Sequence, residues 1–138
     1  MNNRELKFRV WITDWGNSTP YLEYIKEGCL RVYFGNWERG GYKNAIFQQF
    51  TGLKDKNGRE IYEGDILKEH HYEDWGDEEG FEYVGVVRHR SYSNDAGNQF
   101  SGFVTYPNLR ENKGYAGNPI KVDCEVIGNI FENPDLLK

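Results

Sequence analysis

The densest group of side chains that could carry chemistry lies between residues 69 and 82, in the segment EHHYEDWGDEEGFE. It holds seven acidic residues and two histidines, with neither Lys nor Arg. Carboxylates suit hard cations, and His combined with carboxylates suits transition metals. The side chains that could ligate a metal here are His70, His71, Asp74, Asp77, Glu78 and Glu79. A metal-dependent enzyme built on residues 69–79 is therefore one alternative for the function.

Two features of this segment argue against a metal site. Adjacent histidines on a strand point to opposite faces of a sheet, which separates His70 from His71. The spacing also fits neither an EF-hand loop nor the HExxH pattern. We therefore predict a solvated acidic loop and assign no metal ligand.

A basic cluster, Arg88-His89-Arg90, lies on an expected strand close to Tyr92. Arginines interleaved with aromatic rings could bind single-stranded nucleic acid by stacking, as in other small barrels. The net charge of −5 and the pI near 5.2 disfavour this, because nucleic-acid-binding domains typically have a pI above about 9. We favour the interpretation that Arg88 and Arg90 share one strand face and neutralise the acidic segment, and we keep a nucleic-acid-binding small barrel as an alternative.

The tryptophans suggest a third kind of site. Trp11 lies on the polar face of an expected strand, and Trp37 and Trp75 lie in turn-like segments. Exposed Trp is typical of protein interfaces, although the same residues could instead cover a small core. The candidate binding surface consists of Trp11, Trp37, Trp75, Arg88 and Arg90.

Catalytic signatures are missing from the sequence. It contains no nucleophile elbow, P-loop, dinucleotide fingerprint or zinc-ligand spacing. Cys29 and Cys124 lack an evident local base, and we expect both to be free thiols. We predict no catalytic residue and no cofactor, and no motif in the sequence supports an enzymatic function.

Composition and spacing predict a mostly β fold in one domain over residues 1–138. The chain has 16% aromatic residues and 16 glycines, with Ala only at positions 45, 96 and 116. Strands are expected over 5–12, in a hairpin over 21–34, from 64 onward, over 84–91, 100–106 and 122–131, while 42–51 fits a strand or a short helix. Asn57-Gly58 predicts a type I′ turn, and Asn133 predicts the N-cap of a short C-terminal helical turn. The expected architecture is a small barrel or curled sheet, and no apolar run reaches the roughly 18 residues of a membrane span.

Three ordered blocks of the sequence resemble a known family. They are RELKFRVW at 4–11, TGLKDKNGREIYEGDI at 51–66 and EVIGNIFENPDLL at 125–137. Together they are similar to the YopX-like proteins, which are encoded by phages and prophages. The resemblance implies a mainly β fold with an SH3-like C-terminal part, working in the bacterial cytoplasm. It implies no catalytic residue, cofactor or partner.

The middle block has a structural interpretation. Gly52, Gly58 and Gly64 recur every six residues, which suits tight chain reversals. We expect the block to be scaffold, and its charged members Lys54, Asp55, Lys56 and Arg59 are the alternative binding surface. The leading hypothesis is a non-enzymatic module that binds a protein partner or associates with itself.

Overall fold

The computed structural model describes residues 6–12, 20–25, 45–71, 79–93, 96–97, 99–106, 118–121 and 123–137. The chain divides into two compact units, Met1–Gly52 and Leu53–Lys138, and each is described by itself. The single domain over residues 1–138 stays a prediction. Within the described part of the chain, no helix has the length and apolar character needed to cross a membrane.

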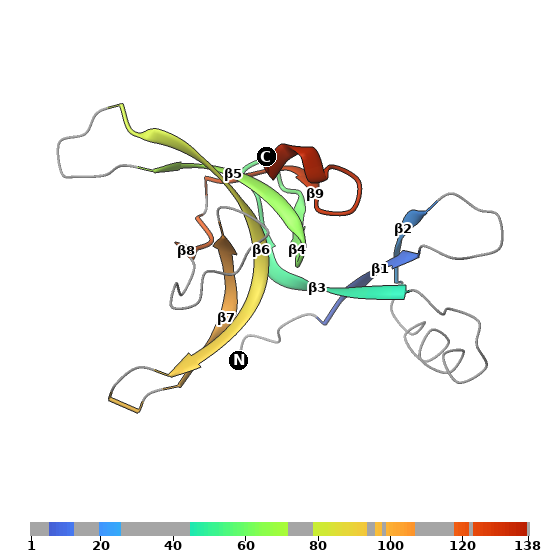
Figure 1. The fold of residues 1–138 in the computed structure, drawn as a ribbon, viewed down its shortest axis with the longest axis horizontal. Helices are drawn as coiled ribbons and strands as arrows, with labels where there is room; N and C mark the ends of the chain where they lie inside the picture. Colours follow the sequence, from blue (N-terminus) through green and yellow to red (C-terminus); the bar gives the residue numbers. More distant parts are fainter. Residues whose placement is uncertain are drawn as a thin grey trace. The chain divides into compact units, whose positions relative to one another are not determined.

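The N-terminal unit is built on an antiparallel sheet. Strand β1 (Phe8–Ile12) pairs with β2 (Tyr21–Tyr24) on one side and with β3 (Ala45–Lys54) on the other (Figure 1). Val10, Ile12 and Ile25 form the buried core, and Phe8 and Phe47 pack against it. The alternation predicted for residues 5–12 is confirmed over Phe8–Ile12, whereas Leu6 precedes the strand and is 62% exposed, and residue 5 lies outside the described residues. Residues 45–51 of the ambiguous segment are strand.

The opposite face of β1 is also buried at one position. Arg9 faces Gln48 across the β1–β3 ladder, and the two side chains are 1% and 3% exposed. Arg9 Nε donates a hydrogen bond to Gln48 Oε1. A buried cation needs such partners because its loss of hydration is costly. The sequence pattern placed Arg9 on a polar face but did not indicate that this face would be covered.

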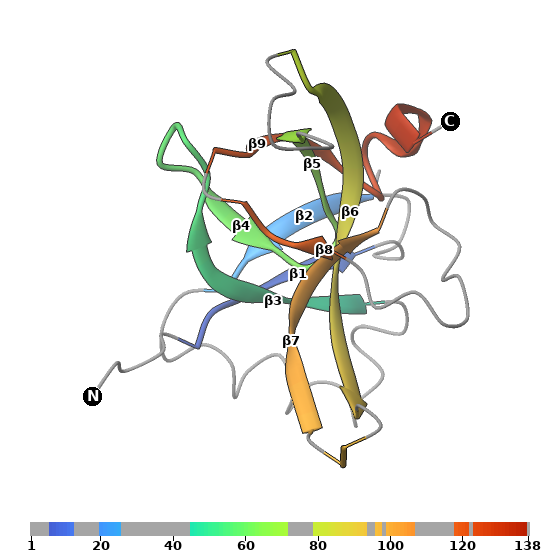
Figure 2. The same ribbon diagram turned by 90° about the vertical axis from the view of Figure 1, so that its left-hand side faces the viewer.

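The C-terminal unit begins at Leu53, within the last residues of β3, and its first complete strand is β4 (Glu60–Tyr62). Five further strands form a sheet in the order β8-β7-β6-β5-β9, with neighbours antiparallel. They are β5 (Asp65–His71), β6 (Phe81–Ser93), β7 (Gln99–Tyr106), β8 (Asn118–Pro119) and β9 (Glu125–Asn129). Figures 1 and 2 show the strong curl of this sheet along the length of β6. The mostly β, curled-sheet fold predicted from the sequence is confirmed.

Both faces of the central strands of the curled sheet are buried, since Ile66 and Val86 on one face are as inaccessible as Leu67 and Val87 on the other, and the main hydrophobic cluster lies on the Leu67 face. Ile61, Leu67, Val87, Cys124 and Val126 are buried there, and Phe103 and Ile120 pack against them. A short 3-10 helix, η1 (Pro134–Leu137), follows β9, and it confirms the predicted C-terminal helical turn. The likeness of this part to an SH3 barrel stays a prediction.

Two local predictions are wrong in detail. Asn57 does not take a positive φ, since among the described residues only glycines do, so the reversal is not a type I′ turn. Instead Gly58 N–H donates to Asp55 O, and of the two residues Asn57 and Gly58 only Gly58 has the left-handed backbone, at φ 82°. Asn133 takes the predicted N-cap position of η1, since its backbone O accepts the N–H of Leu136 at 3.2 Å, but its side-chain Oδ1 accepts the N–H of Asn129 rather than one from the helix.

Candidate functional site

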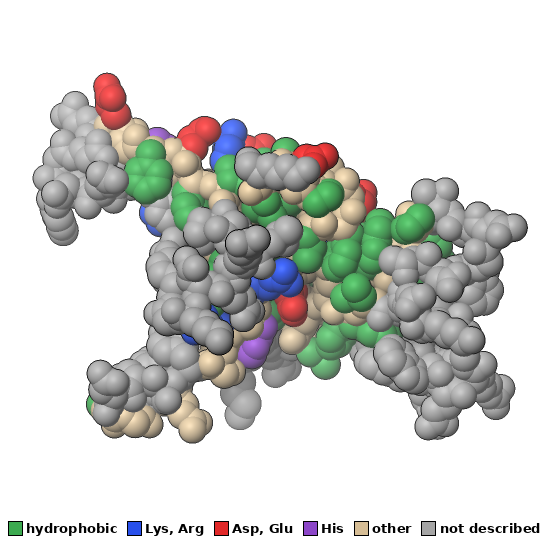
Figure 3. Space-filling model, in the orientation of Figure 1, with side chains coloured by type: hydrophobic (Ala, Val, Ile, Leu, Met, Phe, Trp, Pro, Cys, Tyr) green, Lys and Arg blue, Asp and Glu red, His purple; other side chains and the backbone are tan. Residues whose placement is uncertain are grey.

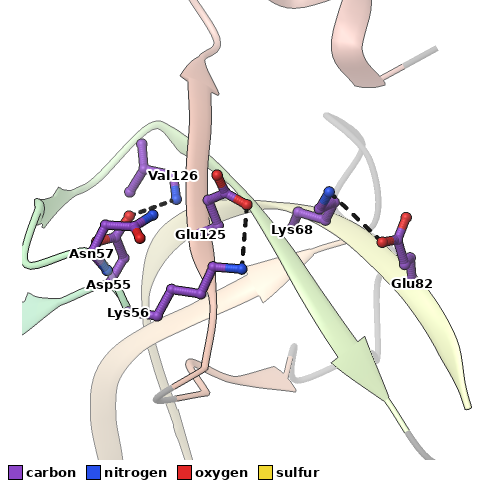
Figure 4. A network of polar contacts seen from close by, with 7 residues as sticks. All are labelled: Asp55, Lys56, Asn57, Lys68, Glu82, Glu125 and Val126. Atoms are coloured by element: carbon purple, nitrogen blue, oxygen red, sulfur yellow. Dashed lines mark hydrogen bonds and ion pairs between the residues drawn. The ribbon is translucent and has the colours of Figure 1, made fainter.

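The carboxylate of Asp55, in the middle sequence block, accepts three backbone N–H groups. Its Oδ1 accepts the N–H groups of Asn57 and Arg59, each at 2.9 Å, and its Oδ2 accepts the N–H of Val126 at 3.0 Å (Figure 4). Burial by itself would raise the pKa of Asp55, but these three donors and the Arg59 charge hold the pKa below its ordinary 3.8. The carboxylate therefore serves the backbone, and it is only 6% exposed.

Other members of the block have similar structural roles. Asp65 Oδ2 accepts the N–H of Tyr62 at 2.8 Å, across the turn that joins β4 to β5. Gly52, Gly58 and Gly64 all have φ between 82° and 86°, which L side chains rarely adopt. Of the four charged residues proposed as an alternative surface, Asp55 is buried, while Lys54, Lys56 and Arg59 are exposed. These contacts support a scaffold role for the block.

The described part of the acidic segment is more ordered than predicted. Glu69 is buried on β5, where its carboxylate accepts the N–H of Lys121 at 3.3 Å, so this end is not a solvated loop. His70 Nε2 donates to the backbone oxygen of Glu79 at 2.9 Å. Glu82 forms an ion pair with Lys68 at 3.7 Å. Strand pairing between β5 and β6 explains the difference, because it carries both ends of the segment into the sheet.

The metal prediction is tested only in part. Within the described residues, no group of three or more His, Cys, Asp and Glu side chains could hold an ion. Asp74, Asp77 and Glu78 lie outside those residues, and for His71 only the backbone is described.

The basic cluster is divided between the two faces of β6. Arg88 and Arg90 share one face, as predicted, and Arg90 Nη1 donates to Tyr106 Oη while its guanidinium lies 5.8 Å from the centre of that ring. His89 points to the other face, where Nε2 lies 3.1 Å from Ser101 Oγ and the ring meets Phe103 edge-on at 5.2 Å. Neutralisation of the acidic segment by the arginines stays a prediction.

An apolar patch lies on the Arg9 side of the N-terminal sheet. Trp11 stands opposite Leu22 of β2 and opposite Ile46 of β3, and Tyr24 stands beside Arg9 in the next row. Ile46 is 49% exposed and Tyr24 is 53% exposed, while Trp11 and Leu22 are half-buried. We call Trp11, Leu22, Tyr24 and Ile46 the Trp11 patch. Figure 3 shows hydrophobic side chains gathered over β1 and β3 on the face in view.

The candidate surface predicted from the sequence is only partly described. Trp37 and Trp75 lie outside the described residues. Trp11 belongs to the N-terminal unit, and Arg88 and Arg90 belong to the C-terminal unit. Sequence reasoning missed Leu22, Tyr24 and Ile46. Leu22 and Tyr24 could have been found, since both fall on one face of a strand expected near the first.

Cys124 is unsuited to nucleophilic chemistry. Its side chain is fully buried in the core of the C-terminal unit. Burial, reinforced by the nearby charges of Glu69, Asp55 and Asp123, raises the pKa of the thiol to about 11. The thiol is therefore protonated at neutral pH. Cys29 lies outside the described residues.

Comparisons with known proteins place the chain in a family. Among solved structures, the crystal structure of protein EF1440 from Enterococcus faecalis is similar, at 25% sequence identity and a TM-score of 0.42, covering 97% of this chain and 99% of that one. A comparison with curated proteins finds no match. The family model described as YopX protein matches residues 7–138, nearly the whole chain and both units. This protein therefore belongs to the YopX family.

Proposed function

We propose that the protein is a non-enzymatic binding module that associates with a second copy of itself through the Trp11 patch. The observation that carries this proposal is the strand register, which brings Trp11, Leu22 and Ile46 into one row with Tyr24 beside it. Aromatic and aliphatic side chains at this density are typical of the centre of a protein interface.

The charge of the patch favours a second copy as the occupant. The chain carries a net charge of −5, so two copies repel one another on average. The four side chains of the patch are uncharged, and the neighbouring Arg9 is buried rather than presented to a partner. Two patches facing each other across a two-fold axis would thus set uncharged side chains against uncharged side chains, and two-fold dimers are the commonest soluble oligomers.

Nucleic-acid binding has less support. Tyr106 is 2% exposed and cannot stack on a base, and Arg90 already contacts that tyrosine. Phosphate contacts are strongest at low salt. We therefore expect no gel shift with single-stranded DNA or RNA at low ionic strength, and a salt-dependent shift that Arg88→Ala removes would instead support the alternative.

Light scattering after size exclusion tests self-association. We expect dimer at high protein concentration and dissociation on dilution. Tyr24→Ser and Ile46→Ser should each weaken the dimer tenfold or more, which corresponds to about 1.4 kcal/mol. Both side chains are about half exposed, so the changes should leave the melting temperature nearly unchanged.

Leu136→Ser is the matched control, because Leu136 is an exposed apolar side chain in the C-terminal unit. It should leave the dimer intact. A strictly monomeric wild-type protein at high concentration would overturn the proposal. Equal weakening by Leu136→Ser would show non-specific association and overturn it as well.

We further propose that the module is encoded by a phage or prophage and acts in the cytoplasm of the bacterial host. The three ordered sequence blocks and the family match over residues 7–138 support this context. The neighbouring genes test it, since a location outside any phage or prophage gene block would contradict it.

A further inference from the structure

Two arginines lie close together on one face of β6, in the part of the strand that extends beyond its pairing with β5. Arg88 stands opposite Val104 of β7, and Arg90 stands opposite Gly102. The guanidinium of Arg90 bonds to Tyr106, which lies four residues beyond Gly102 in β7. The Arg90 side chain therefore extends back past the row of Arg88 and Val104, and this brings two positive charges together on one face.

The charge of Arg88 is not neutralised within the described part of the chain. Its side chain is half-buried, and no described residue forms a hydrogen bond or an ion pair with its guanidinium. The residues beside it on this face of β6 and β7 include no acid, and they are Val86, Arg90, Gly102, Val104 and Tyr106. A half-buried cation next to another cation is unfavourable unless an anion approaches both. The buried Arg9 differs, because Gln48 accepts its hydrogen bond.

Open surface adjoins the two arginines at Gly102. A Cβ built on Gly102 would meet nothing within 4 Å. Gly102 stands opposite Arg90, whose guanidinium is directed away toward Tyr106. The surface over Gly102 therefore leaves room for a small ligand beside the two positive charges.

We propose that Arg88, Arg90 and the open surface at Gly102 form a binding site for a phosphate group, either free phosphate or a small phosphomonoester. A guanidinium presents its N–H donors in a planar fork that matches the oxygens of phosphate. A phosphomonoester carries a charge of about −1.5 to −2 near neutral pH, which balances two cations better than a single carboxylate does. The bond to Tyr106 holds Arg90 in place before the ligand arrives, which lowers the entropic cost of binding.

A nucleic acid suits the same two charges less well. Each of its phosphates is a diester with one negative charge, and the net charge of −5 on this chain repels a long polyanion more than one small anion. The proposed site goes beyond the Trp11 patch and does not depend on it.

Isothermal titration calorimetry with inorganic phosphate, near neutral pH and at constant ionic strength, tests the site. We expect saturable binding of one phosphate per chain. Arg88→Gln should weaken this binding tenfold or more, because it removes both the charge and the fork. Gly102→Val should weaken it to a similar extent without changing the net charge, because the new side chain fills the open surface. If Arg88→Gln does not fold, Arg88→Lys replaces it, since Lys keeps the charge but lacks the fork and should bind phosphate severalfold more weakly.

Lys54→Gln is the matched control. Lys54 is an exposed cation of the same unit, and its loss changes the net charge by the same amount, so this variant should bind phosphate as wild type does. Tyr24→Ser should also bind normally, which separates a failure of self-association from a failure of this site. Tighter binding of glycerol phosphate than of inorganic phosphate would identify an esterified ligand, and equal or weaker binding would identify free phosphate.

The proposal is wrong if wild type shows no saturable binding of phosphate. It is also wrong if Arg88→Gln or Gly102→Val binds phosphate as tightly as wild type. Equal weakening by Lys54→Gln would show a general attraction to positive charge and no site. A single-stranded oligonucleotide that displaces phosphate more effectively than glycerol phosphate does, at equal phosphate concentration, would assign the two arginines to nucleic acid instead.

Discussion

The two units use their side chains in contrasting ways. In the C-terminal unit, the Asp55 carboxylate of the middle block is buried and accepts three backbone N–H groups. In the N-terminal sheet, a cation is buried at Arg9 while Ile46 and Tyr24 remain about half exposed. Asp55 and Asp65, which lie in the middle block shared with the family, thus stabilise the fold through bonds to the backbone. The proposed Trp11 patch joins Trp11, from the first block, to three residues that lie outside all three blocks, namely Leu22, Tyr24 and Ile46.

The largest effect that would break this comparison comes from Asp55→Ala. It leaves three N–H groups without their charged acceptor, and we expect a loss of about 3 to 5 kcal/mol in the free energy of unfolding. Urea denaturation measures it. Lys56→Ala should cost less than about 1 kcal/mol, since its ion pair is half exposed. Equal costs for the two variants would mean that the block acts through its surface charges.

The buried pair of the N-terminal sheet gives the next largest effect. Gln48→Ala removes the acceptor of the Arg9 Nε–H bond and should destabilise the protein by about 1 to 3 kcal/mol. Gln49→Ala is the control, because Gln49 follows on the same strand, points to the other face and is only half-buried. A cost for Gln48→Ala no greater than that of the control would show that Arg9 does not depend on this contact. Thermal denaturation of both variants decides it.

How far the sequence predicted the molecule depends on the range of the interactions. Alternation in residues 5–12 and the turn at Asn57-Gly58 are local features, and both located their elements. The hydrogen bond between Asp55 and Val126 joins residues 71 apart, so no local pattern could reveal that this carboxylate accepts an N–H from the backbone of β9. Glu69 was placed in a solvated loop for the same reason, since its partner Lys121 is 52 residues away.

The candidate site shows the same limit. Trp11 could be singled out from its place in an alternating strand. Ile46 could not be joined to it, because strand pairing across more than 30 residues was not visible in a segment that fitted either strand or helix.

A smaller effect separates backbone conformation from packing in the family block. Gly58 has φ 82° and open space around its missing Cβ, so Gly58→Ala should cost about 1 to 2 kcal/mol from backbone strain alone. Gly102→Ala meets equally open space without a positive φ, and it should stay within about 0.5 kcal/mol of wild type. Matched thermal melts compare them. Similar costs would show that the six-residue glycine spacing is not set by conformation.

The smallest expected effect is a dependence of stability on pH that belongs to Asp55. Its pKa in the folded protein lies below 3.8, so the carboxylate contributes stability that is fully present above the unfolded pKa and is lost as the pH falls through the folded value. Asp55→Asn has no such group. The stability difference between wild type and Asp55→Asn should therefore be constant near neutrality and shrink only below about pH 4, as measured by urea denaturation across that range. A difference that stays constant down to pH 2 would mean that the three N–H donors stabilise the charged carboxylate of Asp55 no better than water does.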